Sequence, residues 1–355
     1  MTVKVAIIGT GWGTRIQVPA FRHVGVEVVG LWARSEEKAK QAASEYSIPF
    51  ATSDYKALLA RQEIDLVSVV TPPYTHAEIS IAALEAGKHV LCEKPTAMNK
   101  GEAEKMLEAA RRHPRLIALI DHELRFNPTR QKMKTLIAEG YVGEVYHIES
   151  TVLGAAMLNP KLVWNWWMER DKGGGLWGAA GSHAIDALTW VLGRRVLRLE
   201  ATLRTFIEDR FDADGKAHKM TSDDYCSAKL KFEGEISGTM QLSAVTTGVS
   251  VSRVLVAGSK GSLLYEGEKL TGYRTDSTAP ESLTVEVSND GIPDVLKSSE
   301  FPRHTITIAQ ALKTAIESGD HSSLAPAATF DDGVYIQKVL DAGYESSEKG
   351  RWVKV

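Results

Sequence analysis

The first third of the chain alternates runs of consecutive apolar residues with segments in which apolar residues recur every three or four positions. The continuous runs are typical of short strands buried on both faces of a parallel sheet, and they cover 3–8, 26–32, 48–50, 65–70, 89–92 and 115–120. Helical spacing follows most of them, at 16–24, 36–46, from about 54, and 77–86. Strands that alternate with helices predict a doubly wound parallel sheet. We place the end of this domain at residue 121.

The pattern changes to a period of two in the second part of the chain. Apolar and polar positions alternate, with polar turns between them, at 144–152, 197–206, 225–233, 235–244 and 251–256, which predicts antiparallel hairpins. Helical periodicity returns at 128–138, 182–192, 305–317 and 331–345, while 272–301 has the composition of an exposed hairpin and loop. The predicted fold is therefore of the α/β class: a doubly wound parallel sheet in residues 1–121, then an α+β domain with a large, mostly antiparallel open sheet in residues 122–355.

Composition narrows the possible partners of the protein. The net charge of −3 provides no electrostatic basis for binding nucleic acid or an anionic membrane. The two cysteines, Cys92 and Cys226, match no metal-ligand spacing, so we expect no metal site. The N-terminal residues enter a strand directly, without a leader or an apolar run near 18 residues. We expect a cytoplasmic protein.

A glycine-rich turn joins the first predicted strand to the first predicted helix. The residues are Gly9-Thr10-Gly11-Trp12-Gly13-Thr14. Gly9 permits a tight turn, and Gly11 lets the backbone approach a pyrophosphate at the start of the helix. Thr14 occupies the position expected for a third glycine, so the packing of helix on strand must tolerate a hydroxyl there. In this context the turn predicts a dinucleotide-binding Rossmann domain, although a plain structural turn is the alternative.

The end of the second strand bears on the choice between NAD and NADP. A carboxylate about 20 residues after the glycine turn would bind the adenosine ribose of NAD, but this chain has Ala33-Arg34-Ser35. A guanidinium and a hydroxyl suit a 2′-phosphate, so we expect NADP in preference to NAD. Alternatively, Arg34 is solvated and Ser35 only caps the next helix. The two interpretations are compatible, because the cap uses the serine and the phosphate uses the arginine.

The segment His89–Pro95 places a lysine where open α/β sheets bind ligands, beyond the carboxyl end of a strand. Pro95 fixes its own φ and favours extended geometry at Lys94, which orients the amine. A surface Glu93–Lys94 pair before a turn is the simpler alternative. The preceding strand ends in Thr71-Pro72-Pro73, where the prolines force the backbone to turn, with His76 shortly after.

The second part of the chain offers a further group of candidate residues. His183 lies in the first turn of the predicted helix 182–192, and Asp186 lies three residues on and shares its face. The tryptophans at 164, 166 and 167 either floor a sugar site or belong to the interdomain core. Arg125 either contacts substrate or forms an ion pair between the domains.

These motifs together resemble the glucose–fructose oxidoreductase/inositol dehydrogenase (Gfo/Idh/MocA) family over essentially the whole chain. The resemblance rests on the glycine turn, Thr71-Pro72-Pro73 with His76, Gly87-Lys88-His89 and Glu93-Lys94-Pro95. Further segments resemble its glucose–fructose oxidoreductase domain-containing branch: Leu31-Trp32, Glu139–Glu144, Thr221–Asp224 and Ala328–Asp332.

The resemblance implies a catalytic role for Lys94 as acid/base, with His183 hydrogen-bonding the same substrate oxygen. It also implies a homodimer or homotetramer formed through the C-terminal sheet. Many relatives carry an aspartate four residues before the histidine, where this chain has Ala179. Without that carboxylate, a proton relay must use Asp186, Asp121, Tyr225 or water, or else be weaker. The residues expected to contact the cofactor are Gly9, Gly11, Trp12, Gly13, Thr14, Ala33, Arg34, Ser35, Thr71, Pro72, His76, Glu93 and Lys94, and those expected to contact substrate are Arg125, Trp166, Trp167 and Asp186.

Two hypotheses on function follow from these residues. The first is an NAD(P)-dependent oxidoreductase that transfers a hydride between the nicotinamide and a sugar, cyclitol or related polyhydroxylated substrate. The second is a non-catalytic NAD(P)-binding sensor or scaffold, which Ala179 favours and the retained Lys94 and His183 disfavour. Redox-assisted glycoside cleavage is a third, narrower possibility that the sequence does not separate from the first. The substrate itself is not readable from the sequence.

Overall fold

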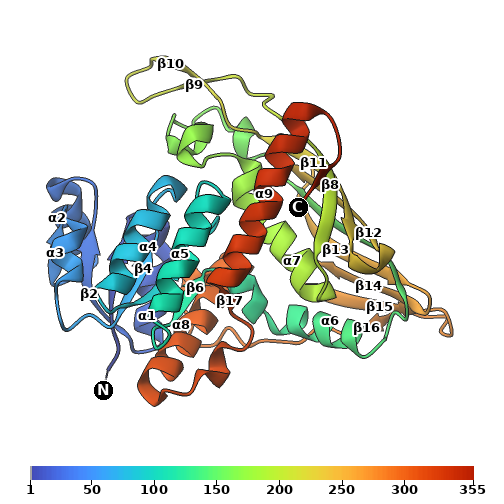
Figure 1. The fold of residues 1–355 in the computed structure, drawn as a ribbon, viewed down its shortest axis with the longest axis horizontal. Coiled ribbons are helices and arrows are strands. Elements are labelled where there is room, and N and C mark those ends of the chain that lie inside the picture. The colour runs from blue at the N-terminus through green and yellow to red at the C-terminus, as the bar shows by residue number, and fades with distance from the viewer. Residues whose placement is uncertain (1) are drawn as a thin grey trace. The chain divides into compact units, whose positions relative to one another are not determined.

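A computed structural model describes residues 2–355, and it divides the chain into two compact units (Figure 1). The first unit contains the chain as far as Asn127 together with Val287–Val334. The second contains Pro128–Glu286 and Tyr335–Val355. The last long helix of the chain, α9 (Phe330–Lys349), begins in the first unit and continues into the second.

The first unit is built on a seven-stranded sheet in the order β17-β6-β5-β4-β1-β2-β3. The six strands from β1 to β6 are parallel, and β17 is antiparallel to β6. The strand order reverses between β1 and β4, which in doubly wound folds is where a dinucleotide binds. The bounds are β1 (Lys4–Ile8), β2 (Glu27–Trp32), β3 (Phe50–Thr52), β4 (Leu66–Val69), β5 (His89–Cys92), β6 (Ala118–Ile120) and β17 (Ala328–Thr329). The predicted Rossmann-type sheet is confirmed.

Helices cover both faces of this sheet and bury a separate hydrophobic core on each. On one face α1 and α8 contribute Phe21, Ile308 and Leu312 to a core that includes Val5 and Ile7 of β1. On the other face, residues of α3, α4 and α5 pack against the alternate side chains of the strands. The bounds are α1 (Val18–His23), α2 (Glu36–Glu45), α3 (Tyr55–Leu59), α4 (His76–Glu85), α5 (Lys100–Arg112) and α8 (Glu300–Ser318).

The compact units divide the chain differently from the sequence-based boundary at residue 121. The chain crosses into the second unit after Asn127, and Val287–Val334 returns to the first unit. The physical reason is burial: α8 completes the core over β1, and β17 extends the sheet beyond β6. Helical periodicity in the sequence shows that a helix has an apolar face, but it does not show which sheet that face covers.

The second unit is built on a nine-stranded open sheet in the order β16-β15-β14-β13-β7-β12-β11-β8-β18. Only β7 and β12 pair in parallel, and every other neighbouring pair is antiparallel, as predicted. The bounds are β7 (Val145–Leu153), β8 (Val196–Arg204), β11 (Tyr225–Phe232), β12 (Ser237–Ser243), β13 (Val251–Gly258), β14 (Gly261–Glu266), β15 (Lys269–Arg274), β16 (Glu281–Ser282) and β18 (Val353–Lys354).

One face of this sheet carries the core of the second unit. The helices α6 (Pro128–Ala138), α7 (Ser182–Leu192) and α9 lie on that side (Figure 1). Their apolar residues pack with alternate residues of the strands, such as Leu230 and Met240. A separate two-stranded hairpin is formed by β9 (Asp209–Phe211) and β10 (Ala217–Lys219).

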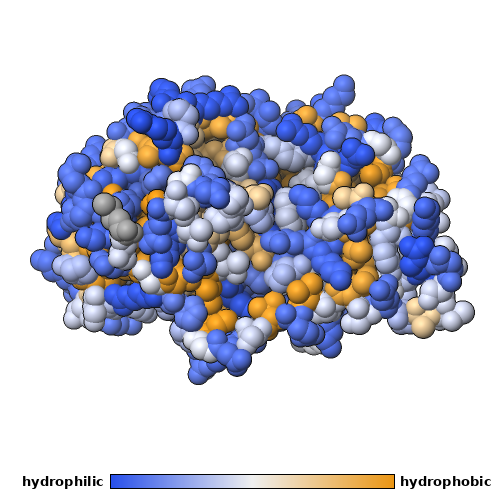
Figure 2. Space-filling model, turned by 90° about the horizontal axis from the view of Figure 1, so that it is seen from below, coloured by the Kyte–Doolittle hydropathy of each residue, from blue (hydrophilic) through white to orange (hydrophobic). Residues whose placement is uncertain are grey.

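The face of the molecule drawn in Figure 2 carries many polar side chains. Figure 2 shows hydrophobic side chains on one face in small groups separated by polar residues. No helix within residues 2–355 is long and apolar enough to cross a membrane.

Candidate active-site residues

The glycine turn after β1 has the backbone geometry that a pyrophosphate-binding loop requires. Gly9 has φ 125°, and a Cβ there would collide with the carbonyl oxygen of Val70. Gly11 has φ 78°, and no atom lies within 4 Å of the position its Cβ would occupy. This positive φ and open space favour glycine and leave the backbone accessible to a ligand.

Close packing of the first helix on the sheet occurs at Gly13, one residue before the position expected from the motif. A Cβ on Gly13 would lie 2.9 Å from Cγ2 of Ile7. The helix opens with a π-helical turn, Gly13–Gln17, before α1 begins. A π-turn holds one residue more than an α-turn, which is consistent with the one-residue shift of the packing glycine. Thr14 is 6% exposed and is accommodated in the same turn.

The end of β2 presents an arginine without a neighbouring free carboxylate. Arg34 is exposed, and its guanidinium has no ion pair within residues 2–355. Ser35 caps α2, since its side chain accepts a hydrogen bond from the Lys38 backbone at 3.3 Å. The Glu36 carboxylate is engaged with the Ser53 N–H at 3.0 Å. Ala33 is buried beside them.

His76 connects the loops that follow β4 and β5. It is fully buried, and its ring nitrogens lie 2.7 Å from the Thr71 carbonyl oxygen and 2.9 Å from the Pro95 carbonyl oxygen. Burial lowers the pKa of His76, and a neutral ring donates to only one of these two carbonyls. In this position His76 ties together the loops that follow β4 and β5. The loop after β4 is further held by Thr75, whose hydroxyl donates to Oγ1 of Thr71 at 2.6 Å.

Lys94 follows β5 at the carboxyl edge of the parallel sheet. The Lys94–Pro95 peptide bond is cis, and Lys94 is partly exposed. The backbone N–H of Lys94 donates to Oε2 of Glu93 at 3.3 Å, and the N–H of Glu93 continues the ladder to Val69 at 2.9 Å. The side chain therefore begins at the edge where the strand order reverses.

Two residues outside the expected cofactor and substrate contacts lie against Glu93, one of which, Asp121, was expected only as a possible relay residue. Asp121 follows β6, the neighbour of β5, and is 1% exposed. Gln17, from the turn after the glycine loop, is fully buried, and its Nε2 lies 3.0 Å from Oδ2 of Asp121 and 3.4 Å from Oε1 of Glu93. The position of Asp121 directly after a strand was a signal in the sequence, whereas nothing in the sequence singles out Gln17.

The carboxyl groups at this edge bind protons more tightly than exposed carboxyl groups do. Burial raises the pKa of Glu93, while the charge of Lys94 lowers it. Burial and the charge of Glu93 raise the pKa of Asp121 well above its usual range. Burial, with the charges of Asp121 and Glu93, also raises the pKa of Glu123 well above its usual range. Within residues 2–355 no group of three metal-ligating side chains is arranged to hold a metal ion.

In the second unit, His183 lies in the first turn of α7 as the sequence predicted, and it is partly exposed. Asp186 is on the same helix but is only 3% exposed. A π-helical turn, Trp177–Gly181, precedes α7 and contains Ala179. Trp177 anchors this turn in the core, because its side chain is fully buried and donates to the Leu340 carbonyl at 2.9 Å.

Asp223 holds the start of the segment that leads to His183. Its Oδ2 accepts a hydrogen bond from the Trp177 N–H at 2.6 Å, and a Cβ on Gly175 would lie 2.5 Å from its Oδ1. Burial raises the pKa of Asp223 to about 6. In the sequence, Asp223 stood out only as part of the segment Thr221–Asp224, which resembles the family. Its hydrogen bond with the Trp177 N–H could not be predicted without the fold.

The tryptophans at 166 and 167 form a short 3-10 turn, capped by Asn165, and both are partly exposed. The Gly174 backbone lies so close to the Trp167 carbonyl that a side chain at 174 would collide with it. Trp164, by contrast, stacks on the His218 ring with 4.9 Å between centroids. Trp164 and Trp167 also pack against the core of the second unit, so a sugar floor formed by the tryptophans stays a prediction.

Arg125 is engaged in the first unit. It is 6% exposed, pairs with Asp332 at 3.2 Å and donates to the Ala327 carbonyl at 3.4 Å. The ion pair links the chain after β6 to the start of α9. Substrate binding by Arg125 remains a prediction.

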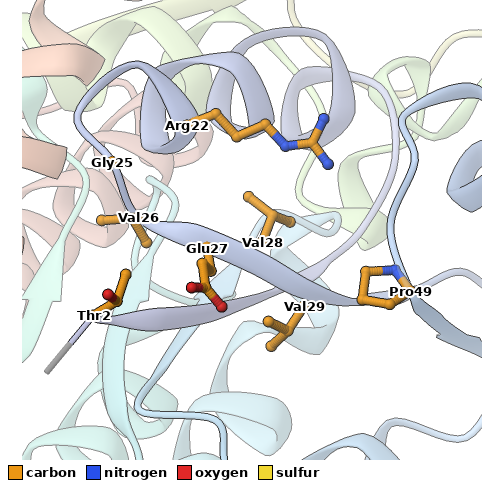
Figure 3. Close-up of a pocket in the computed structure, with 8 residues that line it drawn as sticks. All are labelled: Thr2, Arg22, Gly25, Val26, Glu27, Val28, Val29 and Pro49. Carbon is orange, nitrogen blue, oxygen red and sulfur yellow. The ribbon is translucent and has the colours of Figure 1, made fainter.

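A shallow hollow of about 420 Å³ lies on the first unit, around the start of β2 (Figure 3). It is lined by Thr2, Arg22, Gly25, Val26, Glu27, Val28, Val29 and Pro49. These residues surround β2, mainly at its start, whereas the glycine turn and Arg34 lie at strand ends. The hollow is open and lacks a set of convergent polar groups, so we do not consider it a candidate active site.

Comparison with known proteins covers both parts of the chain. Residues 3–120 match the family described as "Oxidoreductase family, NAD-binding Rossmann fold", and residues 130–264 match the "GFO/IDH/MocA C-terminal domain". The chain is 34% identical over 367 residues to glucose-fructose oxidoreductase domain-containing protein 2 of Bos taurus, covering 100% of this chain and 94% of the relative.

Solved structures share the fold over the full length. The oxidoreductase domain protein from Kribbella flavida is 27% identical, with a TM-score of 0.87 and 100% of both chains covered. Levoglucosan dehydrogenase in complex with NADH and L-sorbose is 23% identical, with a TM-score of 0.88 over 100% of this chain and 99% of that chain. At this identity the second likeness is evidence for the fold alone.

Proposed function

Because the chain belongs to the Gfo/Idh/MocA family of oxidoreductases, we propose that it is an NAD(P)-dependent oxidoreductase acting on CH–OH groups of a sugar, cyclitol or related polyhydroxylated compound. The observation that carries the proposal is the position of Lys94, at the carboxyl edge of the sheet whose β1 leads into the open glycine turn. The substrate class is carried over from levoglucosan dehydrogenase, a protein of the same fold.

The residues at this edge fit a dinucleotide. The backbone around Gly11 has the open space that a pyrophosphate would fill, and the helix start behind it offers N–H donors. When bound, the nicotinamide supplies or accepts the hydride. The residues proposed to hold the cofactor are Gly9, Gly11, Trp12, Gly13, Thr14, Ala33, Arg34, Ser35, Thr71, Pro72, Glu93 and Lys94, with His76 acting through its loops.

Lys94 is the proposed acid/base of the reaction. It would take a proton from the substrate hydroxyl during oxidation, or return one to the oxygen during reduction. His183 would assist by hydrogen bonding to substrate. The partly exposed tryptophans 166 and 167, with Arg125 and Asp186, are the proposed substrate contacts.

The test of this role removes the side-chain amine of Lys94. Lys94→Ala is expected to lower turnover by about two to four powers of ten, the contribution typical of a general acid–base group, with NADPH affinity nearly unchanged. Turnover is measured as reduced nicotinamide absorbance with a panel of monosaccharides, anhydrosugars and cyclitols. Lys105→Ala, an exposed lysine on α5, is the control. Full activity in Lys94→Ala would contradict the assignment.

We propose NADP as the preferred cofactor. Arg34 is exposed at the end of β2, and the nearest acid, Glu36, is engaged with the Ser53 backbone. A free guanidinium suits a 2′-phosphate. Arg34→Ala is expected to weaken NADPH binding about ten- to hundredfold, as loss of a charge-assisted contact does, and to leave NADH binding unchanged. Fluorescence titration measures both, with Arg112→Ala on α5 as the control. Tighter binding of NADH than of NADPH by the unmodified protein would overturn this preference.

A non-catalytic NAD(P)-binding sensor or scaffold is the second candidate. Ala179 favours it, because no carboxylate stands in the turn before His183. Under this function the protein would bind NADPH but turn over none of the panel. Under the first function at least one polyhydroxylated compound reduces or oxidises the cofactor.

A further inference from the structure

The edge of the sheet around Lys94 holds more carboxyl groups than one amine can balance. Asp121 and Glu123 are 1% and 4% exposed, and Glu93 beside them is partly exposed. If all three were ionised, three negative charges would face the single positive charge of Lys94. Buried charge without a partner is strongly unfavourable, so protons remain on some of these groups.

Gln17 determines which two carboxyl groups are held together. Its Nε2 donates to Oδ2 of Asp121 at 3.0 Å and to Oε1 of Glu93 at 3.4 Å. Its carbonyl oxygen accepts from the Ser68 hydroxyl, so the amide cannot flip without losing all three contacts. One amide nitrogen thus bridges the two carboxyl groups, and Oδ1 of Asp121 is buried without a hydrogen-bond partner among the described residues. Two ionised carboxylates held this close repel each other, and a proton on one of them removes the repulsion.

We propose that Glu93 and Asp121 carry one shared proton at neutral pH and exchange it with the amine of Lys94. The inference rests on the proposed acid/base function of Lys94. Glu93 and Asp121 act through Lys94 and are therefore positioning residues. Like charges held at this proximity favour a single-proton state, because the second ionisation must occur against the first charge.

The proton transfers balance in each direction. When Lys94 protonates a substrate oxygen, an N–H bond breaks and an O–H bond forms. The neutral amine then takes the shared proton, so that a carboxyl O–H bond breaks and an N–H bond re-forms. Solvent restores the proton through Glu93, the partly exposed member of the pair. During oxidation of a hydroxyl the same transfers run in reverse.

The surrounding groups affect the pair in known directions. The positive charge of Lys94 lowers the pKa of Glu93 and that of Asp121. The negative charges of Asp121 and Glu93 in turn raise the pKa of the neighbouring Glu123. The Cys92 thiol is buried beside them and its pKa is raised by burial, so it stays neutral. His122 is buried next to Asp121 in the chain. Gln17 and Ser68 are neutral and fully buried.

The first experiment needs no substrate. The protein is labelled with ¹³C in the carboxyl groups of Asp and Glu, and the resonances are followed by NMR as the pH is changed. Several resonances, including those of Glu123 and Asp223, are expected to titrate above the ordinary carboxyl range. One of the raised titrations, that of the Glu93–Asp121 pair, should be absent in Asp121→Asn, which keeps an acceptor for Gln17. Lys94→Met, which removes the positive charge, should move this titration to higher pH. Glu85→Gln, an exposed carboxylate paired with Arg112, should leave it unchanged.

The second experiment uses any substrate found in the panel. Asp121→Asn and Glu93→Gln are expected to lower kcat by up to about a hundredfold, the lower end of an acid–base contribution, and to shift the pH profile of kcat. KM should change little in both variants, and the Kd for NADPH should change little in Asp121→Asn, a pattern that a purely structural defect would not produce. Glu93→Gln is the second variant in case Asp121→Asn fails to fold.

The outcomes separate this inference from the proposed function. Carboxyl titrations confined to the ordinary range, all retained in Asp121→Asn, or unaffected by Lys94→Met, overturn the shared proton. An unchanged pH profile of kcat in both folded variants overturns the exchange with Lys94. If the raised titration is present and responds to Lys94→Met but no compound is turned over, the proposed function fails while the shared proton is supported.

Discussion

Burial determines which carboxyl groups of this protein hold a proton. Asp212 is partly exposed and hydrogen-bonded to His218, and this bond lowers its pKa. Asp223 lies in the same unit but is 7% exposed, and burial raises its pKa to about 6 although it accepts the Trp177 N–H. Desolvation disfavours the charged form more than one backbone hydrogen bond favours it. The start of the turn that leads to His183 is thus held by a group that titrates between pH 4 and pH 7.

Asp223 should make the stability of the protein dependent on pH. Its folded pKa is raised above the unfolded value, so the folded state binds the extra proton, and stability falls as pH rises from about 4 to about 6. A shift of about two units corresponds to roughly 3 kcal/mol, at about 1.4 kcal/mol per unit. The asparagine in Asp223→Asn does not titrate, so this variant does not lose stability in that way as pH rises. Its free energy of unfolding in urea, relative to that of the unmodified protein, should therefore increase by up to roughly 3 kcal/mol between pH 4 and pH 7.

Asp214→Asn, an exposed aspartate near the β9–β10 hairpin, is the control for this measurement and should show no such trend. A constant offset between Asp223→Asn and the unmodified protein at every pH would mean that Asp223 is ionised throughout. The comparison between variants is needed because Glu93, Asp121 and Glu123, whose pKa values are also raised, contribute a pH dependence of the same sign.

At the scale of elements, the contact between the first helix and β1 places the glycine turn. Gly13 lies against Ile7 and Val70, at the point where β1 and β4 diverge. Thr14, at the position of the motif's third glycine, is itself buried. The close packing at Gly13 was not predicted from the motif spacing.

Gly13→Ala should therefore be costly, whereas glycine at 14 is not required. A methyl group 2.9 Å from Cγ2 of Ile7 must displace the helix, and overpacking of this kind costs about 1–3 kcal/mol. The displacement should also weaken NADPH binding, because the turn moves with the helix. Thermal unfolding and fluorescence titration measure the two effects. Gly101→Ala, the same change at an exposed position in α5, should alter stability by no more than about 1 kcal/mol; an equal effect at both positions would contradict the packing argument.

Periodicity predicted most elements of the sheets and much less of what surrounds them. The strands at 4–8, 27–32 and 66–69 follow from runs of apolar residues, and α7 at 182–192 follows from helical spacing and Gly193. The β14–β15 hairpin was missed because Gly, Ser and Lys interrupt its alternation. Similarly, Lys94 and His183 could be selected by motif, but Gln17 and Asp121 meet only through the sheet, from positions 104 residues apart.

At the scale of the whole molecule, the chain crosses between its two units more than once. Val287–Val334 returns to the first unit after β16, and α9 then re-enters the second unit, where β18 adds the last strand of the nine-stranded sheet. Each unit therefore depends on segments distant in sequence for its core, as Ile308 and Leu312 show in the first and Val339 and Leu340 in the second. Truncation at residue 286 would remove part of both cores.

The nine-stranded sheet leaves one face without a helix of its own unit. Along the row Glu149, Leu255 and Leu264, neighbouring strands present partly exposed side chains on that face. A second copy of the chain is the proposed cover, in line with the homo-oligomer expected from the sequence. Paired leucines on adjacent strands supply apolar area, and the polar residues around them supply hydrogen-bond partners, as in the rim of an interface.

Leu264→Lys should therefore shift the protein from oligomer to monomer. A charge placed opposite Leu255 on the interface must be desolvated without a partner, which disfavours association, while the exposed monomer tolerates it. Light scattering with size-exclusion chromatography over a range of protein concentrations measures the mass, and circular dichroism checks that the monomer is folded. Leu158→Lys, a matched exposed leucine outside the sheet, should leave the mass unchanged. A monomeric unmodified protein, or a Leu264→Lys protein of unaltered mass, would show that this face is not where copies of the chain meet.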